Sequence, residues 1–524
     1  MQCMSRIYLD IFPGPLHQMG APPPTPPSSS SSLHPRTSRT NMPPLIRVAI
    51  IGLSASAVTS WASQAHLPYL LSARGRARFT IVALCNSSVE AARAAIRAFD
   101  LPSPPPSPSS AGGGAGGQPG QGEGEEGVLN GIRAYGDPQS LADDPDVDLV
   151  VCCTRVDVHL ATVLPSVRAG KHVYVEWPLA QDERRARELL EAATEAGRVG
   201  AGLLGEKKQQ KIIVGMQGRV APPLVKLKQL LAEGRIGRVL SSEARAFGGS
   251  HDRERLMVGL RCFTELDVGG NIVTIGFGHL FDQIQHVLGD MQDIRAQLQL
   301  QRPNVTLIEP PSSSSSSSPS SSPSKVVEIT RSNVPDLIIA TGTLLPLIHQ
   351  LQPASSPTTT TTATTNQLNA VSSGSGVGSG SAPSVLISYR RGQPFPGTPA
   401  FVWTINGERG EIRLTAPGGP TLQSSTYAHG TRVTIEVHDF AGRSVSGGGG
   451  GGSGGGGSGG NGGDVVESVP WEWEAWQGAL PVPARNVARI YEDFAEGRAT
   501  PSGEDALKRH VQLGEILRAW TPPH

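Results

Sequence analysis

Residues 52–57 are the first place in the chain where residue types and spacing indicate a binding site. They follow a continuous apolar run typical of a buried parallel strand and read Gly-Leu-Ser-Ala-Ser-Ala. A turn of small residues between strand and helix lets the backbone approach a pyrophosphate, with Gly-x-Gly-x-x-Gly/Ala as the usual pattern. Gly52 keeps the tight turn and Ala57 permits close helix packing, whereas Ser54 restricts the backbone but offers a hydroxyl. The expected dinucleotide contacts in this loop are Gly52, Leu53, Ser54 and Ala55. A turn of small residues without a ligand accounts for the loop alone equally well.

The end of the second predicted strand, at 79–85, lacks the carboxylate that usually binds the ribose hydroxyls of NAD. Asn86 and Ser87 stand there instead, and the next acidic residue is Glu90. Either Asn86 or Ser87 can hydrogen-bond a ribose or tolerate a 2′-phosphate. The sequence therefore predicts NAD or NADP without choosing between them.

A strand–helix–strand unit at 147–179 places further polar residues at strand ends, where ligands bind in parallel sheets. Its second strand ends in Glu176 and Trp177, and Thr154 and His159 follow its first strand. We expect these four residues to contact the cofactor. Three of them have a structural alternative: a structural carboxylate for Glu176, packing for Trp177, and capping or packing for His159.

Composition excludes several classes of protein. The 524 residues are enough for two domains, and Lys+Arg and Asp+Glu number 45 each, so no basic surplus indicates direct binding to nucleic acid or to a membrane. No apolar run reaches the roughly 20 residues that span a bilayer. Cys85, Cys152 and Cys153 fall in predicted buried strands, and we interpret them as core thiols in a reducing compartment rather than as disulfides or a metal site. We expect a cytoplasmic or nuclear protein.

Alternating strands and helices predict a doubly wound parallel sheet over residues 45–217. The Pro/Ser-rich residues 1–44 have no strand or helix period and are predicted to form a disordered arm, and 102–127 an insertion.

Residues 218–524 show a different pattern. Successive strand candidates without intervening helices predict an antiparallel sheet, with a helix at 272–288 and two helices at the end of the chain. The Ser/Thr/Gly tracts at 312–324, 355–381 and 447–463 are predicted to be loops. Trp471, Trp473 and Trp476 are interpreted as covering the sheet, with an interaction segment as the alternative.

These residues together resemble the Gfo/Idh/MocA family of oxidoreductases, and within it the fungal galactose-pathway repressor branch. The resemblance covers about residues 46–345. It is carried by residues 52–57, Trp61, His66-Leu67-Pro68, His159, Gly170-Lys171, Val175-Glu176-Trp177, Gln217-Gly218-Arg219, Gly278-His279 with Asp282, Val334-Pro335-Asp336 and Thr341-Gly342-Thr343.

The resemblance implies a Rossmann domain, then an open-faced β-sheet domain, with Gln217 and Arg219 near the ligand between them. In active members a Lys stands where this chain has Trp177, and an Asp/His pair handles the substrate hydroxyl. An indole does not titrate, so the Lys role is lost. His279 and Asp282 keep the His-x-x-Asp spacing as the candidate catalytic pair, but Ile275 replaces the usual acid four residues before the histidine.

Two hypotheses follow. In the first, the protein is a dinucleotide-sensing regulator with impaired catalysis that binds NAD(P) and, as the repressor branch does, a transcription-factor partner. In the alternative, it is an active NAD(P)-dependent oxidoreductase that acts on a sugar or polyol hydroxyl through His279. An empty scaffold is a third interpretation, based on Ser54. The exposed face of the second sheet predicts a homodimer.

Overall fold

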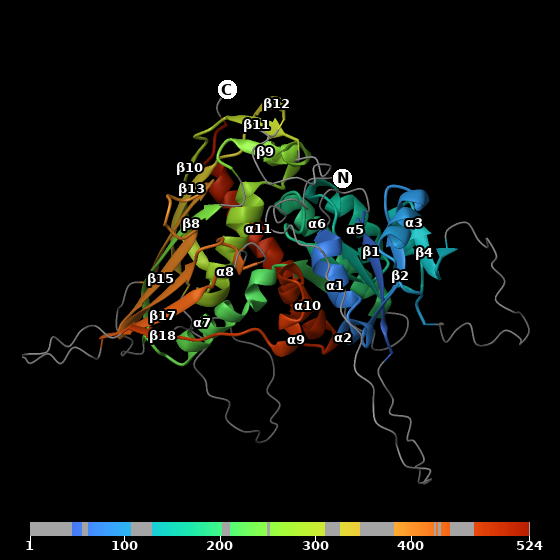
Figure 1. The fold of residues 1–524 in the computed structure, drawn as a ribbon, viewed down its shortest axis with the longest axis horizontal. Helices are drawn as coiled ribbons and strands as arrows, with labels where there is room; N and C mark the ends of the chain where they lie inside the picture. The colour runs from blue at the N-terminus through green and yellow to red at the C-terminus, as the bar shows by residue number, and fades with distance from the viewer. Residues whose placement is uncertain are drawn as a thin grey trace, which may run out of the picture.

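The computed structural model describes residues 44–54, 61–105, 128–201, 210–248, 252–309, 325–345, 382–423, 426–427, 431–440 and 466–522. Two sheets lie apart with helices between them (Figure 1). Residues 1–43, most of the 102–127 insertion and the tracts at 312–324, 355–381 and 447–463 lie outside the described residues, as do Ala55 and Ala57.

The first sheet is the predicted Rossmann-type sheet, with strand order β3-β4-β2-β1-β5-β6-β7. Its pairs are parallel apart from β3–β4. Its strands are β1 (Ile46–Ile51), β2 (Phe79–Cys85), β3 (Val128–Leu129), β4 (Ile132–Tyr135), β5 (Leu149–Cys152), β6 (His172–Glu176) and β7 (Ile212–Gly215). In the register, Ile51 lies beside Cys152, and Cys152 beside Val175. Because these strands are parallel, the loops after β1, β5 and β6 meet at one edge of the sheet.

Helices follow these strands as the sequence predicts. They are the π-helix η1 (Ala62–His66), α1 (Leu67–Leu70), α2 (Ala73–Arg76), α3 (Val89–Ala98), α4 (Pro138–Ala142), the 3-10 turn η3 (Val156–Val158), α5 (His159–Arg168) and α6 (Glu183–Ala201). Ser88 caps α3 by accepting the N–H of Ala91, and Asp137 caps α4 in the same way. Cys85, Cys152 and Cys153 are free thiols, the first two buried, in agreement with their interpretation as core residues.

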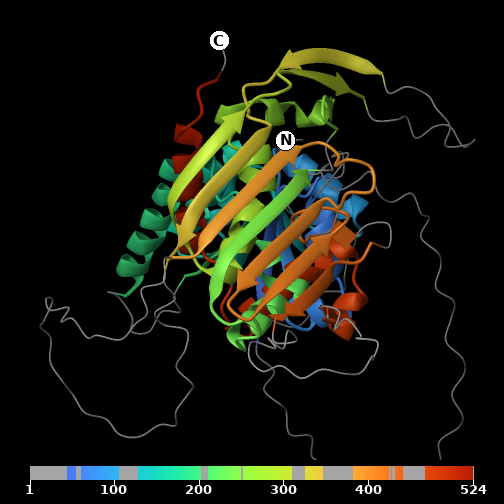
Figure 2. The ribbon, with the colours of Figure 1, turned by 90° about the vertical axis from the view of Figure 1, so that its left-hand side faces the viewer.

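The second sheet has the order β10-β13-β14-β8-β15-β16-β17-β18, and among these strands only β8 and β14 pair in parallel. Its strands are β8 (Val239–Gly248), β10 (Met291–Gln299), β13 (Leu337–Leu344), β14 (Ser384–Arg391), β15 (Phe401–Gly407), β16 (Gly410–Ala416), β17 (Thr434–Asp439) and β18 (Val466–Ser468). The predicted antiparallel sheet is thus confirmed, with one parallel pair. A small sheet adds β9 (Arg255–Met257), β11 (Asn304–Ile308) and β12 (Val326–Arg331). One face of the large sheet carries no helix in Figure 2.

The helices of the second half lie between the two sheets (Figure 1). They are η4 (Gln217–Val220), α7 (Pro222–Ala232), η5 (Val258–Thr264), η6 (Leu266–Val268), the π-helix η7 (Ile272–Phe277), α8 (Gly278–Leu288), α9 (Ala475–Gly478), α10 (Val482–Ala495) and α11 (Gly503–Arg518). One apolar core runs from the first sheet through α11 and α8 to the second sheet. The buried face of α10, which includes Tyr491, completes the other core of the Rossmann sheet. The end of the chain therefore returns to the first domain. No helix in the described ranges is long and apolar enough to cross a membrane.

Candidate functional site

The loop after β1 fits the close backbone approach that a dinucleotide needs. Gly52 has φ +93°, and a Cβ there would lie 3.0 Å from both the Cys153 carbonyl oxygen and the Thr154 Cγ2. The turn is thus open only to glycine. Leu53 is fully buried beneath it, and Ser54 is half-buried.

Asn86, at the end of β2, is tied to this loop. Its Nδ2 donates to the Leu53 carbonyl at 2.7 Å and to the Ala91 carbonyl at 3.3 Å. The amide therefore joins the first turn to α3 and keeps its own oxygen for a further donor. Ser87 is exposed beside it.

Glu176 is buried and held through both carboxylate oxygens. His66 Nε2 lies 2.9 Å from Oε1, and Gln217 Nε2 donates to Oε2 at 2.6 Å. His66 is fully buried, and its Nδ1 lies 2.8 Å from the Tyr491 hydroxyl of α10. A hydroxyl that donates to Nδ1 leaves Nε2 to donate to Glu176. Sequence reasoning did not place His66 or Tyr491 in the site. The His66-Leu67-Pro68 motif was the available signal for His66, and nothing local marks Tyr491.

Trp177 lies in the apolar core and not on an open surface, with 2% of its area exposed. Its Nε1 donates to the Thr274 carbonyl of η7 at 2.8 Å. A Cβ on Gly278 would lie 3.1 Å from that nitrogen, so the helix approaches the indole closely at a glycine. The ring centre is 5.0 Å from that of His510, a residue of α11 that sequence reasoning also missed. Trp177 therefore joins the end of β6 to the helices of the second half.

His159 holds the turn after Trp177 against the end of β5. Its Nδ1 lies 3.0 Å from the Pro178 carbonyl oxygen and its Nε2 3.0 Å from the Thr154 carbonyl oxygen. The ring is fully buried, and burial lowers its pKa below the usual 6.5. At neutral pH the ring carries one proton and donates to one carbonyl at a time.

A hydrogen-bond chain brings His279 together with Glu176. Gln217 donates to Glu176 and accepts from Gln423 Nε2 at 2.9 Å, and the same Nε2 lies 3.0 Å from His279 Nδ1. Burial lowers the pKa of His279 to about 4, so the imidazole is neutral at pH 7. Gln423, about 140 residues from His279 along the chain, could not be found from local sequence.

Asp282 faces two guanidinium groups instead of His279. Arg219 donates to it from Nε at 2.8 Å and from Nη2 at 2.6 Å, and Arg509 Nε donates at 3.1 Å. Despite burial, these cations lower its pKa to about 2. Arg219 also pairs with Asp505 at 2.9 Å. Arg219 therefore forms ion pairs with both Asp282 and Asp505.

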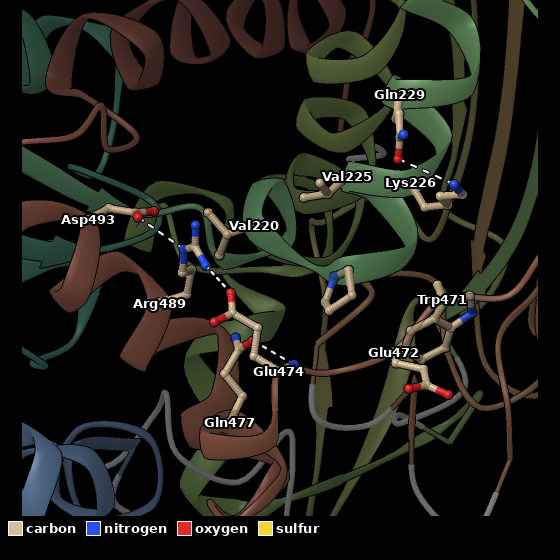
Figure 3. A pocket seen from close by; sticks show the side chains of 11 residues that line it. Val220, Val225, Lys226, Gln229, Trp471, Glu472, Glu474, Gln477, Arg489 and Asp493 are labelled. Carbon is tan, nitrogen blue, oxygen red and sulfur yellow. Dashed lines mark hydrogen bonds and ion pairs between the residues drawn. The ribbon is translucent and has the colours of Figure 1, made fainter. Parts of the chain in front are cut away.

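A separate pocket of about 480 Å³ lies between α7 and α10 and contains none of the predicted site residues. Figure 3 shows Lys226 and Val225 of α7 on one side, Arg489 of α10 on another, and Trp471 and Glu472 on the segment that precedes α9. The Trp471 Nε1 donates to the Val433 carbonyl at 2.8 Å, next to the second sheet. The Trp476 ring instead packs against Tyr69 and Arg74 of the first domain, so the prediction that this segment covers the second sheet is confirmed for Trp471 and wrong for Trp476. The described residues contain no group of three or more His, Cys, Asp or Glu that could hold a metal.

Two family models match successive parts of the chain. Residues 46–202 match the oxidoreductase family with an NAD-binding Rossmann fold (Gfo/Idh/MocA), and residues 222–345 match the C-terminal domain of Gal80p. The Aspergillus oryzae "Dehydrogenase aclE" is 29% identical over 275 residues, which are 50% of this chain and 60% of that protein. The Saccharomyces cerevisiae "Galactose/lactose metabolism regulatory protein GAL80" is 26% identical over 248 residues, which are 46% of this chain and 47% of that protein. The chain thus spans about half the length of these curated relatives.

Solved structures share the fold. A super-repressor mutant of Gal80p from Saccharomyces cerevisiae has a TM-score of 0.62 at 19% identity, over 91% of this chain and 96% of that chain. A levoglucosan dehydrogenase in complex with NADH and levoglucosan has a TM-score of 0.54 at 15% identity, over 91% of this chain and 97% of the other. The chain therefore combines an NAD-binding Rossmann domain of the Gfo/Idh/MocA type, matched over residues 46–202, with a domain similar to the C-terminal domain of Gal80p, matched over residues 222–345.

Proposed function

We propose that this protein is an NAD(P)-binding regulator with impaired catalysis. The observation that carries the proposal is the environment of Trp177, the residue at the position of the catalytic lysine in active relatives. The indole is buried, its one N–H is bound to the Thr274 carbonyl, and it carries no proton that titrates at neutral pH. At this position the side chain packs the two halves of the protein together and takes no part in acid–base chemistry.

The rest of the expected catalytic set supports the same conclusion. The carboxylate of Asp282 is neutralised by Arg219 and Arg509 and is not free to orient His279. His279 is a weak base, because burial holds its pKa at about 4. A general base works best when its pKa lies near the working pH, so this arrangement is poorly suited to taking a proton from a substrate hydroxyl.

The dinucleotide is the part of the family function that the geometry supports. Gly52, Leu53, Ser54 and Ala55 would hold the pyrophosphate, and Asn86 with Ser87 the adenosine ribose of NAD or NADP. Thr154, His159, Glu176, Trp177, Gln217 and Arg219 are the remaining proposed contacts. A bound nicotinamide would supply hydride chemistry in an active enzyme; here the proposed role of the dinucleotide is to set the state of a regulator.

The test is calorimetric titration of the full chain with NAD, NADP and their reduced forms, followed by turnover assays with sugars and polyols. We expect micromolar binding without turnover at ordinary enzyme rates. Gly52→Ala should weaken binding, because φ is +93° and the new Cβ meets the Cys153 carbonyl. Gly170→Ala is the matched control, since its φ is +74° with nothing within 4 Å of the added Cβ. Turnover at enzyme rates, or no binding of any dinucleotide, would refute the proposal.

The alternative, an oxidoreductase of a sugar or polyol, is favoured by one contact. His279 joins Glu176 through Gln423 and Gln217, an arrangement in which a neutral imidazole could act alone. If turnover is found, His279→Ala should abolish it; unchanged turnover would exclude this mechanism.

The proposed partners are a transcription factor and a second copy of the chain. We propose the transcription factor because the GAL80 relatives are named as regulatory proteins. A protein with such a partner is expected in the cytoplasm or the nucleus. The second copy follows from the open face of the large sheet (Figure 2). Light scattering on the eluting protein should give a dimer, and a monomer at all concentrations would contradict this.

A further inference from the structure

The pocket of about 480 Å³ between α7 and α10 has no role in the proposed function. Its volume is in the range of sites that hold small molecules, and none of the proposed dinucleotide contacts lines it. Both helices lie between the two sheets (Figure 1), so the pocket is not part of the open face of the large sheet that we assign to a second copy. A ligand in this pocket therefore competes neither with the dinucleotide nor with the second copy.

The apolar lining of the pocket consists of four side chains, Val220, Pro222, Val225 and Trp471. Val225 is 54% exposed, and an apolar ligand group that covers it removes apolar surface from water. Trp471 is already fixed, because its Nε1 donates to the Val433 carbonyl at 2.8 Å. A side chain that is held in place before binding loses little conformational freedom when a ligand packs on it. The pocket is therefore prepared for an apolar or aromatic group.

The charges at the α10 end of the pocket neutralise one another. Arg489 donates from Nε to Asp493 at 3.0 Å, and its Nη1 donates to Glu474. Asp493 also accepts the Nε of Arg498 at 2.6 Å, and Glu474 accepts the Trp476 Nε1 at 2.7 Å. These side chains hold α10 against the segment that precedes α9, and they leave no unmatched charge at this end of the pocket.

Lys226 and Glu472 are the two charged lining residues that form no ion pair within the described ranges. Lys226 donates from Nζ to the Gln229 Oε1 at 3.3 Å, and Glu472 has no hydrogen bond to a described residue. Trp471 lies between Lys226 and Glu472 in Figure 3. The pocket thus offers one cation and one anion, with an aromatic ring between them.

We propose that this pocket binds a small zwitterion with an apolar side chain, in the size range of an amino acid or a dipeptide. The carboxylate of the ligand pairs with Lys226, and its ammonium group pairs with Glu472. The apolar side chain of the ligand packs on Trp471 and Val225. Each polar contact joins an ionised donor to an ionised acceptor, which is the stronger class of hydrogen bond. Because the ligand brings one charge of each sign, it pairs both unmatched side chains and adds no net charge.

Ligands with charges of one sign fit this pocket less well. A phosphate or a dicarboxylate would be attracted to Lys226 but repelled by three carboxylates in the lining, those of Glu472, Glu474 and Asp493. A polyamine would meet the cations of Lys226 and Arg489. A metal ion is not expected, since the described residues hold no group of three or more His, Cys, Asp or Glu that could bind one.

The probes are L-phenylalanine and the dipeptide leucyl-phenylalanine, titrated calorimetrically into the full chain without dinucleotide. We expect saturable binding of at least one probe at one site. Phenethylamine lacks the carboxylate and 3-phenylpropanoate lacks the ammonium group, so each should bind about threefold to fivefold more weakly than phenylalanine, as for a partly exposed ion pair. The dipeptide with acetylated and amidated ends keeps its apolar side chains but loses both charges, and it should bind more weakly than the free dipeptide.

Two substitutions assign the two ends of the ligand. Lys226→Gln should weaken binding of the zwitterion by about threefold to fivefold and leave binding of phenethylamine unchanged, because phenethylamine has no carboxylate to lose. Glu472→Gln should weaken the zwitterion in the same way and leave binding of 3-phenylpropanoate unchanged. The matched controls are Lys325→Gln and Glu309→Gln, which remove an exposed cation and an exposed anion that pair with each other at 3.3 Å outside the pocket. Both controls should bind the probes as the wild type does.

Three results would overturn this assignment. The first is the absence of saturable binding of either probe. The second is equal affinity for the single-charge analogues or for the capped dipeptide, since the pocket would then be a groove for an apolar segment of a protein. The third is equal weakening in the pocket variants and in the matched controls. Because no dinucleotide is present in these titrations, their outcome does not depend on the proposed function.

Discussion

The Asp282→Asn substitution separates a structural carboxylate from a catalytic one. Asp282 is 2% exposed and lies between two guanidinium groups, Arg219 and Arg509. Asparagine keeps the shape of the side chain and removes its charge. Arg219 would retain Asp505, and Arg509 would retain Asp290, so both cations stay partly compensated.

The size of the effect follows from the pKa of Asp282. A fall from the usual 3.8 to about 2 corresponds to about 2 kcal/mol of stability, at about 1.4 kcal/mol for each pH unit. Removing one partner of a buried ion pair costs about 3–5 kcal/mol where nothing replaces it. Because two other carboxylates remain, we expect the free energy of unfolding to fall by about 2–4 kcal/mol.

The sign of the pH dependence is fixed by the direction of that pKa. A carboxyl whose pKa is lowered in the folded state stabilises the protein above about pH 4, and this stability is lost as pH falls towards 2. The difference between wild type and Asp282→Asn should therefore be complete at pH 7 and shrink below pH 4.

Urea unfolding at pH 7 measures this difference. The matched control is Asp290→Asn, whose carboxylate also pairs with Arg509 but is 27% exposed, so its loss should cost about 1 kcal/mol or less. If Asp282→Asn is no less stable than Asp290→Asn, the reasoning fails. A variant of full stability that loses sugar turnover would instead make Asp282 a catalytic residue.

Two further predictions concern the contacts around Trp177. Trp177→Phe leaves the buried Thr274 carbonyl without its donor and should lower the free energy of unfolding in urea by about 1–3 kcal/mol. The control Trp520→Phe removes a similar but exposed indole hydrogen bond and should change the free energy of unfolding far less. Equal losses of stability in the two variants would contradict the prediction. Burial lowers the pKa of both His279 and His510 to about 4. The unfolded chain therefore takes up protons at a higher pH than the folded one, and the free energy of unfolding should fall as pH drops from about 6.5 to 4. At pH 5 the loss should be about 2 kcal/mol for each histidine. His510→Gln should remove its share of that slope, and an unchanged slope between pH 7 and pH 5 would refute the assignment.

Local sequence was sufficient for much of the Rossmann domain. The strands beginning at Ile46, Phe79 and His172 are runs of largely buried apolar residues, and such runs predict a strand from the local sequence alone. The strand β10 was not predicted, although its apolar residues Ile294, Ala296 and Leu298 alternate with exposed polar ones. Asp293 interrupts this pattern, with φ +53° beside a break in the register. A strand of this kind owes its place to its neighbours in the sheet.

The candidate site divides in the same way. The identities of Gly52, Glu176 and Trp177 and their positions after strands are properties of the sequence, because parallel strands bring their carboxyl ends together wherever they pair. What those side chains do was decided by residues far away in the chain. Tyr491 returns from α10 to hold His66 against Glu176, and Gln423 joins His279 to Gln217.

The ion pairs of Asp282 also depend on the tertiary structure. The His-x-x-Asp spacing places His279 and Asp282 on one helix, but spacing does not say which cation comes near. Arg509, more than 220 residues later, lies on the last helix and reaches Asp282 only because α11 packs beside α8. A buried carboxylate needs a cationic partner, because burying the charge alone costs too much free energy. Which cation lies close enough to pair with it depends on tertiary contacts that the local sequence does not show.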